Sequence, residues 1–171
     1  MGKNIFEYKS GLPATPSQPT FSLSTEGGDL LVQEVKVKVL GKNEVLRTYR
    51  IPLENIISLE IVTEKELKDK SVLGRGAVGA LLLGPVGAVL GGMSGVGSKQ
   101  KSVFMLAVAY ATQSAPGEVK TLVFNAEYAG WLGQNQAAVR QIKKEMEGVQ
   151  PSALVSQCIG QSVAPDGSIT L

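Results

Sequence analysis

The feature that most constrains this chain is an uncharged, glycine-rich run from Gly76 to Ser98, GAVGALLLGPVGAVLGGMSGVGS. Its 23 residues reach the length of about 20 that a membrane-spanning helix needs. Glycines and Pro85 interrupt the run, however, and both residue types weaken a regular helix. We therefore interpret it as a candidate membrane segment with an unusual backbone. Basic residues flank it on both sides, namely Lys68, Lys70, Arg75, Lys99 and Lys101.

Composition excludes several classes of function. The 171 residues fit one domain, and 17 Lys and Arg against 15 Asp and Glu give no strongly basic surface for nucleic acid. Histidine is absent and Cys158 is the only cysteine, which excludes histidine-based acid–base catalysis, a Cys/His metal cluster and an internal disulfide. We expect no catalytic residue, no metal and no cofactor. The first twenty residues hold no apolar stretch of secretory-signal length, so a cytoplasmic location is expected.

Alternating apolar and polar residues predict a sheet on both sides of the run. Between Leu31 and Leu40 the residues Val35, Val37 and Val39 alternate with charged ones, the period of a half-buried strand. Further strands are predicted at 45–51, 57–61, 103–111 and 119–124. Residues 10–20 hold three prolines among Ser, Thr and Gly, so residues 1–20 are expected to form a flexible arm.

One amphipathic helix is predicted after the last strand. Apolar residues from Tyr128 to Met146 recur at spacings of three and four, with Trp131 on the apolar face and Asn125 as a plausible N-cap. Residues 149–171 are interpreted as a polar tail that includes Cys158. Several antiparallel strands closed by one helix are typical of an α+β fold.

The order of these parts resembles a known family. The stretches IPLENIISLEIVTE and GRGAVGALLLGPVGAVLGGMSG, followed by a strand pair and a terminal helix, look like the bacterial pleckstrin-homology-like proteins with a glycine-zipper insert. The resemblance is to the YokE/SHOCT-associated type, which is common in Gram-positive bacteria and their phages and whose members often carry a short C-terminal oligomerisation helix. The resemblance covers roughly residues 30–147. It implies a bent antiparallel sheet over residues 21–148, capped by its C-terminal helix, with residues 70–100 inserted between strands and no catalytic residues.

Within the run, Gly87, Gly91 and Gly95 stand four residues apart and would line one stripe of a helix, where another backbone can approach closely. A single membrane crossing would place the strands before and after the run on opposite sides, where they could not share a sheet. A hairpin that bends at Gly84 and Pro85 returns to the side that it left. Two legs of about eleven residues reach only ~17 Å, about half of a ~30 Å hydrocarbon core. Such a hairpin can dip into a membrane but cannot span it.

Two environments remain open for this hairpin. The flanking cations attract anionic lipid, which favours a dip into a membrane, whereas small-residue helices could also be tucked against the domain or against another copy of it. The sequence thus predicts a non-enzymatic binding or assembly module that contacts a membrane or itself, in the cytoplasm or at the inner face of the cell membrane. The alternative is a soluble phage or prophage regulator that binds a host protein through the sheet edge.

Two nucleotide-binding motifs are superficially present. Gly74, Gly76 and Gly79 spell G-x-G-x-x-G, but the charged segment before them is not a strand, so a dinucleotide site lacks its context. The segment 92–99 resembles a P-loop, yet Ser98 precedes Lys99 and the order required for phosphate binding is the reverse. Neither motif predicts a nucleotide site.

Overall fold

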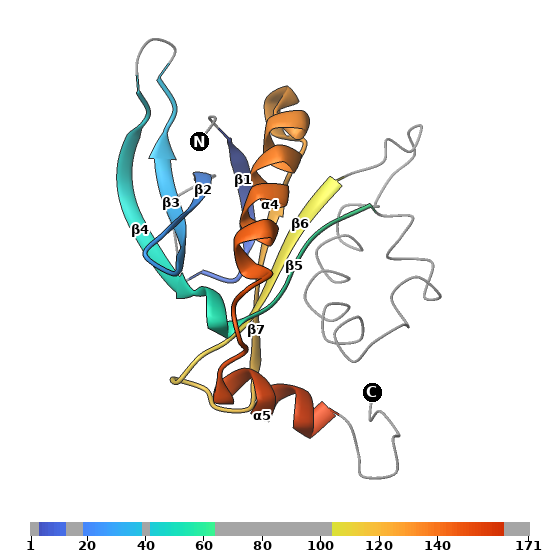
Figure 1. Cartoon of the computed structure of the whole chain (residues 1–171). Coiled ribbons are helices and arrows are strands. Elements are labelled where there is room, and N and C mark those ends of the chain that lie inside the picture. The colour runs from blue at the N-terminus through green and yellow to red at the C-terminus, as the bar shows by residue number, and fades with distance from the viewer. Residues whose placement is uncertain (1–3, 13–18, 39–41, 64–103, 163–171) are drawn as a thin grey trace.

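The computed structural model describes residues 4–12, 19–38, 42–63 and 104–162 of the chain (Figure 1). Among these residues strands predominate. The elements are β1 Phe6–Ser10, β2 Thr20–Glu26, β3 Asp29–Lys36, β4 Glu44–Pro52, η1 Leu53–Asn55, β5 Ile56–Thr63, β6 Phe104–Ala111, β7 Val119–Asn125, η2 Tyr128–Gly130, α4 Leu132–Met146 and α5 Ala153–Ser162. One 3-10 helix (η1) joins β4 to β5, a second (η2) lies between β7 and α4, and two α-helices follow.

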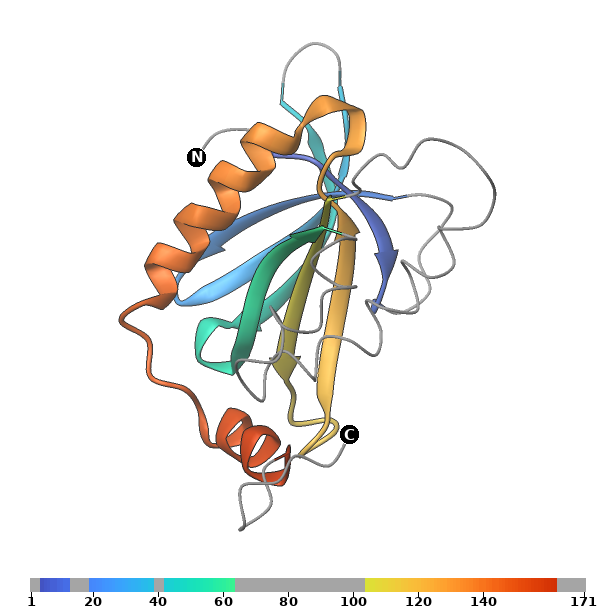
Figure 2. The same cartoon turned by 90° about the vertical axis from the view of Figure 1, so that its right-hand side faces the viewer.

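The seven strands form one antiparallel sheet in the order β4-β3-β2-β1-β7-β6-β5. Strands β4 and β5 lie at opposite edges, yet only the three residues of η1 join them. In a flat sheet, six spacings of about 4.8 Å would separate the edges by roughly 29 Å, whereas three residues bridge at most about 14 Å. The sheet therefore curls until its two edges meet at η1 (Figures 1 and 2). The bent antiparallel sheet of an α+β fold is confirmed.

The core fills the inside of this curl. Phe6, Phe21 and Phe124 are fully buried, and the Phe21 and Phe124 ring centroids lie 5.6 Å apart. Helix α4 crosses the open end of the curl (Figure 2), contacts β2 and β5, and adds Val139 and Ile142 to the core. Burial of each such side chain stabilises the fold by about 1.5–3 kcal/mol. The predicted capping helix is therefore part of the core.

The N-terminal segment differs from the sequence-based prediction. Strand β1 lies in the middle of the sheet, where Phe6 pairs with Phe21 of β2 and Tyr8 pairs with Phe124 of β7. The prediction of a flexible arm over residues 1–20 is wrong for residues 4–12, because Phe6 is buried in the core. The proline-rich composition that suggested an arm begins only at Pro13.

Two buried amides hold β1 in place. The Oδ1 atom of Asn135 on α4 accepts a hydrogen bond from the Ile5 N–H at 2.9 Å, and its Nδ2 donates to the carbonyls of Ile5 and Ala126 at 2.6 and 2.8 Å. The Nδ2 atom of Asn4 donates to the Leu23 carbonyl at 2.9 Å, and its Oδ1 accepts from the Leu23 N–H at 2.7 Å. The start of β1 is thereby tied to α4 and to β2.

Glycines set two of the turns. Gly27 and Gly28 join β2 to β3 with φ values of 61° and 88°, the two left-handed residues that a type I′ hairpin turn requires. Strand β3 then ends at Lys36, earlier than the predicted end at Leu40, and Val37 is exposed. Gly130 has φ 82° just before α4, a value that glycine adopts without steric cost.

Helix α4 begins later than predicted. Asn125 ends β7 and its Oδ1 accepts a hydrogen bond from the Glu127 N–H at 2.9 Å, so it forms a local turn and does not cap α4. The element η2 intervenes, and Trp131 occupies the N-cap position of α4. Trp131 is partly buried rather than part of the buried core.

A second helix occupies part of the predicted tail. In α5, Val155 and Cys158 are each 2% exposed and pack on Ala111 of β6. The hydroxyl of Ser152 accepts a hydrogen bond from the Val155 N–H at 3.4 Å and donates to Asn55 Oδ1 at 2.6 Å. The prediction of a polar tail over residues 149–171 is thus wrong for residues 153–162.

Candidate functional site

The predicted glycine-zipper hairpin lies outside the described residues, but its two attachment points are described. Strand β5 ends at Thr63 and β6 begins at Phe104, and these two residues are direct partners in the sheet. The 40 residues between them therefore leave the sheet and return to it at one point. The premise of the argument against a single membrane crossing, that the strands before and after the run share one sheet, is confirmed.

The individual residues predicted for this site all lie between these two attachment points. The packing glycines and the five flanking cations all belong to the segment 64–103, outside the described residues, and stay predictions: Gly84, Gly87, Gly91, Gly95, Lys68, Lys70, Arg75, Lys99 and Lys101. None of the described helices is both long and apolar enough to cross a membrane. In the same part of the chain, no three His, Cys, Asp or Glu residues gather as metal ligands.

Next to the attachment points, the outer face of the sheet has an unusual composition. Partners in an antiparallel pair share a face, so the register separates inward residues such as Leu106 and Phe124 from outward ones such as Ala107 and Val123. We call the outward-facing residues of β5, β6 and β7 beside the insertion the alanine face. It includes Ser58, Val62, Met105, Ala107, Ala109, Thr121 and Val123. At its edge lies the half-exposed Glu60, which is the β5 partner of Ala107 and forms an ion pair with Lys143 of α4 at 2.6 Å.

Most of the alanine face is buried even though it lies opposite the core. Met105, Ala107, Ala109 and Val123 are all 0% exposed. A sheet that meets water on one face has strands in which apolar and polar residues alternate. Strand β6 instead reads FMLAVAYA and presents apolar residues on both faces of the sheet. Helix α5 covers only the end of this surface at Ala111. Ala107, Ala109 and Val123 belong neither to the core inside the curl nor to the smaller cluster under α5.

Three hydroxyl groups on this side of the sheet are buried without a hydrogen-bond partner. They are Ser10 Oγ, Ser58 Oγ and Thr121 Oγ1. Ser58 and Thr121 flank Ala109 in one row across the sheet, and Ser10 is the β1 neighbour of Val123. A buried hydroxyl without a partner costs about 1–3 kcal/mol. Three such groups around one alanine row therefore indicate a surface built to meet other polar groups.

Strand β4 offers a different kind of surface, an open sheet edge. It pairs with β3 on one side, and its residues from Glu44 to Thr48 are exposed. Val37, Val45 and Leu46 on this hairpin are 47%, 49% and 56% exposed. An edge strand presents unpaired backbone groups that can pair with another chain. The structure thus contains the sheet edge that the alternative function requires.

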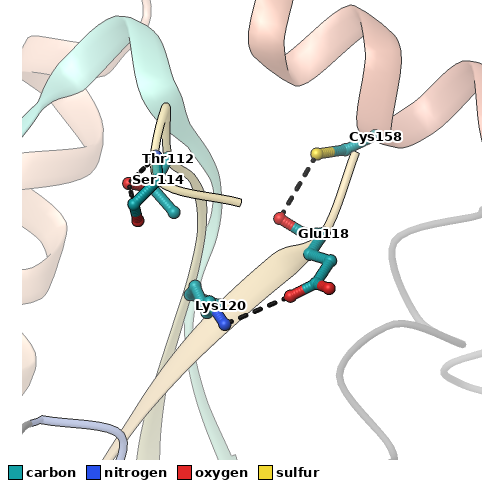
Figure 3. A network of polar contacts seen from close by, with 5 residues as sticks. All are labelled: Thr112, Ser114, Glu118, Lys120 and Cys158. Atoms are coloured by element: carbon teal, nitrogen blue, oxygen red, sulfur yellow. Dashed lines mark hydrogen bonds and ion pairs between the residues drawn. The ribbon is translucent and has the colours of Figure 1, made fainter. Parts of the chain in front are cut away.

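The single cysteine lies beneath α5, near the turn between β6 and β7 (Figure 3). Its Sγ donates a hydrogen bond to the Glu118 carbonyl at 3.6 Å, while the Glu118 carboxylate pairs with Lys120 at 3.2 Å. Thr112 and Ser114 share a hydrogen bond at 3.1 Å across the same turn. Because Cys158 is buried, the structure supports a packing role and not a reactive thiol in a polar tail.

Comparison with known proteins supports the architecture. A family model described as glycine zipper containing PH domain matches residues 23–125, more than half of the chain. Two curated relatives are each 37% identical over 60 residues, or 35% of this chain. One is an immunity protein of Bacillus phage SPbeta, and the other is an SPbeta prophage-derived uncharacterized membrane protein, YomJ, of Bacillus subtilis strain 168. The match covers 30% and 26% of the lengths of these relatives. No solved structure matches the chain.

The family model and the fold agree on the same parts. The match takes in strands β2 to β7 together with the glycine run between β5 and β6, and the relatives point to phages of Bacillus. These findings support the pleckstrin-homology-like resemblance with a glycine zipper, but not the YokE type in particular. The chain belongs to the family of glycine zipper-containing PH domains.

Proposed function

We propose that this chain is a non-enzymatic binding module that contacts a membrane surface, or another copy of itself, through the glycine-zipper hairpin between β5 and β6. The observation that carries this proposal is the direct pairing of Thr63 with Phe104. Because the insertion begins and ends at one point of the sheet, both ends of its uncharged run face the same side of any membrane that it meets.

The charge pattern around the run favours an anionic membrane at the inner face of the cell. The basic residues Lys68, Lys70 and Arg75 precede the run, and Lys99 and Lys101 follow it. Each cation near an anionic lipid surface contributes roughly 1 kcal/mol. One relative is named a membrane protein, which agrees with this choice of partner. PH-like domains are generally non-enzymatic, and neither relative's name indicates catalysis.

The glycines supply the close contact that a short hairpin needs. With Gly84 at the bend, Gly87, Gly91 and Gly95 would line one stripe on which a second helix can lie without intervening side chains. The second helix is the other leg of the hairpin or the same stripe of another copy. Self-association and membrane contact thus use the same residues.

Vesicle flotation with the full chain tests the proposal. We expect the chain to float with vesicles of phosphatidylcholine and phosphatidylglycerol but not with phosphatidylcholine alone. Raising the ionic strength from about 0.1 M to about 1 M shortens the Debye length from about 10 Å to about 3 Å and should reduce flotation. Light scattering without vesicles tests self-association. A chain that stays unbound and monomeric under all these conditions contradicts the proposal.

A second function, binding of a host protein through the sheet edge, is favoured by the exposed edge strand β4. Added strands form main-chain hydrogen bonds with such an edge, and Val45 and Leu46 offer apolar contacts beside it. One relative is named an immunity protein of a phage. If this is the function, the chain should not float with vesicles but should bind a purified host protein. Leu46→Lys should weaken binding of the host protein, whereas Gly91→Leu should leave it unchanged.

A further inference from the structure

We propose that the alanine face is the seat of the chain's own glycine-rich run, residues 76–98, whenever that run is not in contact with lipid. This inference rests on the proposed function and adds the surface that receives the run in water. A large apolar segment exposed on a monomer would be an aggregation site, so the run needs such a surface.

The position of the insertion identifies the occupant. Met105, at one end of the alanine face, immediately follows Phe104, where the 40-residue segment rejoins the sheet, and it pairs with Val62, which precedes Thr63. The segment is therefore attached at the margin of this face by both of its ends. Because it is tethered at Thr63 and Phe104, the run has a high effective concentration at this face. The run of a second molecule in dilute solution would have a lower one.

The side chains of the face match a glycine-rich partner. Ala107 and Ala109 offer only methyl groups over the middle of the outer surface, and both are fully buried. Small residues let two backbones approach closely. The glycines of the run allow the same approach from the other side, whereas a segment of bulky side chains would be held away from the sheet.

The unpartnered hydroxyls point to backbone as the opposing surface. Thr121 is 7% exposed, and its Oγ1 finds no hydrogen-bond partner. Ser58 Oγ and Ser10 Oγ are in the same situation nearby. Carbonyl groups at helix ends and next to proline lack helical N–H partners, and Gly84-Pro85 places such carbonyls inside the run. The three hydroxyls can donate to them.

Disulfide cross-linking in the full chain tests the seat directly. In a Cys158→Ala background, Ala109→Cys is combined in turn with Gly87→Cys, Gly91→Cys and Gly95→Cys, and Thr48→Cys on the exposed part of β4 replaces Ala109→Cys as the control. We expect at least one Ala109 pair to form an intramolecular disulfide tenfold faster than its Thr48 counterpart. If no Ala109 pair exceeds its control, the proposal is wrong.

The products also separate this inference from the proposed function. A dimeric cross-linked product would contradict the proposal that the alanine face binds the run of the same molecule, but it would agree with self-association. Intramolecular cross-linking in a chain that neither floats with vesicles nor associates would support the seat and contradict the proposed function.

A hydrogen-exchange measurement provides the second readout and needs no cysteine. Thr121→Val removes one hydroxyl at nearly constant volume, and Thr48→Val makes the same change at an exposed position. In the absence of vesicles, we expect amide exchange of peptides within residues 76–98 to rise about fivefold in Thr121→Val, the change that corresponds to loss of one hydrogen bond of about 1 kcal/mol. Exchange equal to that of Thr48→Val would overturn the assignment of Thr121 as a donor to the run.

Discussion

Asn135 shows how much of this fold depends on one buried polar side chain. Its amide makes three hydrogen bonds to backbone groups of Ile5 and Ala126, and the residue is 0% exposed. Backbone groups buried without partners are costly, so this amide satisfies the start of β1 where the sheet ladder does not. The sequence gives no signal for it, because an asparagine on a helix is usually a surface residue.

Asn135→Ala should therefore be strongly destabilising. It leaves three buried backbone groups without partners, and each costs about 1–3 kcal/mol, so we expect the free energy of unfolding to fall by about 3 kcal/mol or more. Urea denaturation measures the loss, with Gln134→Ala at the exposed neighbouring position as the control. A loss below about 0.5 kcal/mol, the level of ordinary surface substitutions, would contradict this role.

At the scale of elements, the sequence predicts β4 to β7 and α4 well because their signals are local. Alternation in 45–51 and 57–61 and the apolar run at 103–111 fall on strands, and the three- and four-residue spacing after Tyr128 falls on α4. Strand β1 was missed because its five residues are short and precede a proline-rich stretch. Helix α5 was missed although Leu154, Val155, Cys158 and Ile159 form one apolar side behind Ser152 and Pro151.

Phe6→Ala tests whether β1 is a core strand or part of a loose arm. Phe6 is fully buried against Phe124, with ring centroids 6.1 Å apart. Truncation of a buried phenylalanine typically costs 3–5 kcal/mol, so the urea midpoint should fall steeply. Lys120→Ala, on the neighbouring strand β7 in an exposed ion pair with Glu118, should change stability by less than about 1 kcal/mol. Equal, small effects of both substitutions would contradict the core position of β1 and support the flexible-arm interpretation.

The candidate site was predictable only in part for a related reason. A long uncharged run with glycines at fixed spacing is a local signal, and the need for strands on both sides to share a sheet fixes its return to one point. The alanine face depends instead on the register between β5, β6 and β7. Alternate residues of FMLAVAYA are similarly apolar, so the sequence does not show which of them face the core.

At the scale of the whole molecule, a curled sheet holds an insertion at one point beside a surface of small residues. The core fills the inside of the curl, and helices α4 and α5 pack against the sheet. The proposed function assigns binding to the glycine-rich run, and its central claim is that the glycine stripe of this run makes a close helix contact.

The most direct test of this claim compares Gly91→Leu with Val89→Leu by flotation with anionic vesicles and by light scattering. A leucine at position 91 separates backbones that Gly87, Gly91 and Gly95 allow to approach, whereas position 89 lies off that stripe. Overfilling a tight contact costs typically 1–3 kcal/mol, roughly a 5- to 150-fold change in an equilibrium. We predict that Gly91→Leu weakens vesicle binding or assembly by that factor while Val89→Leu behaves like the native chain. Equal behaviour of the two variants would show that the glycines make no close contact and would contradict the claim.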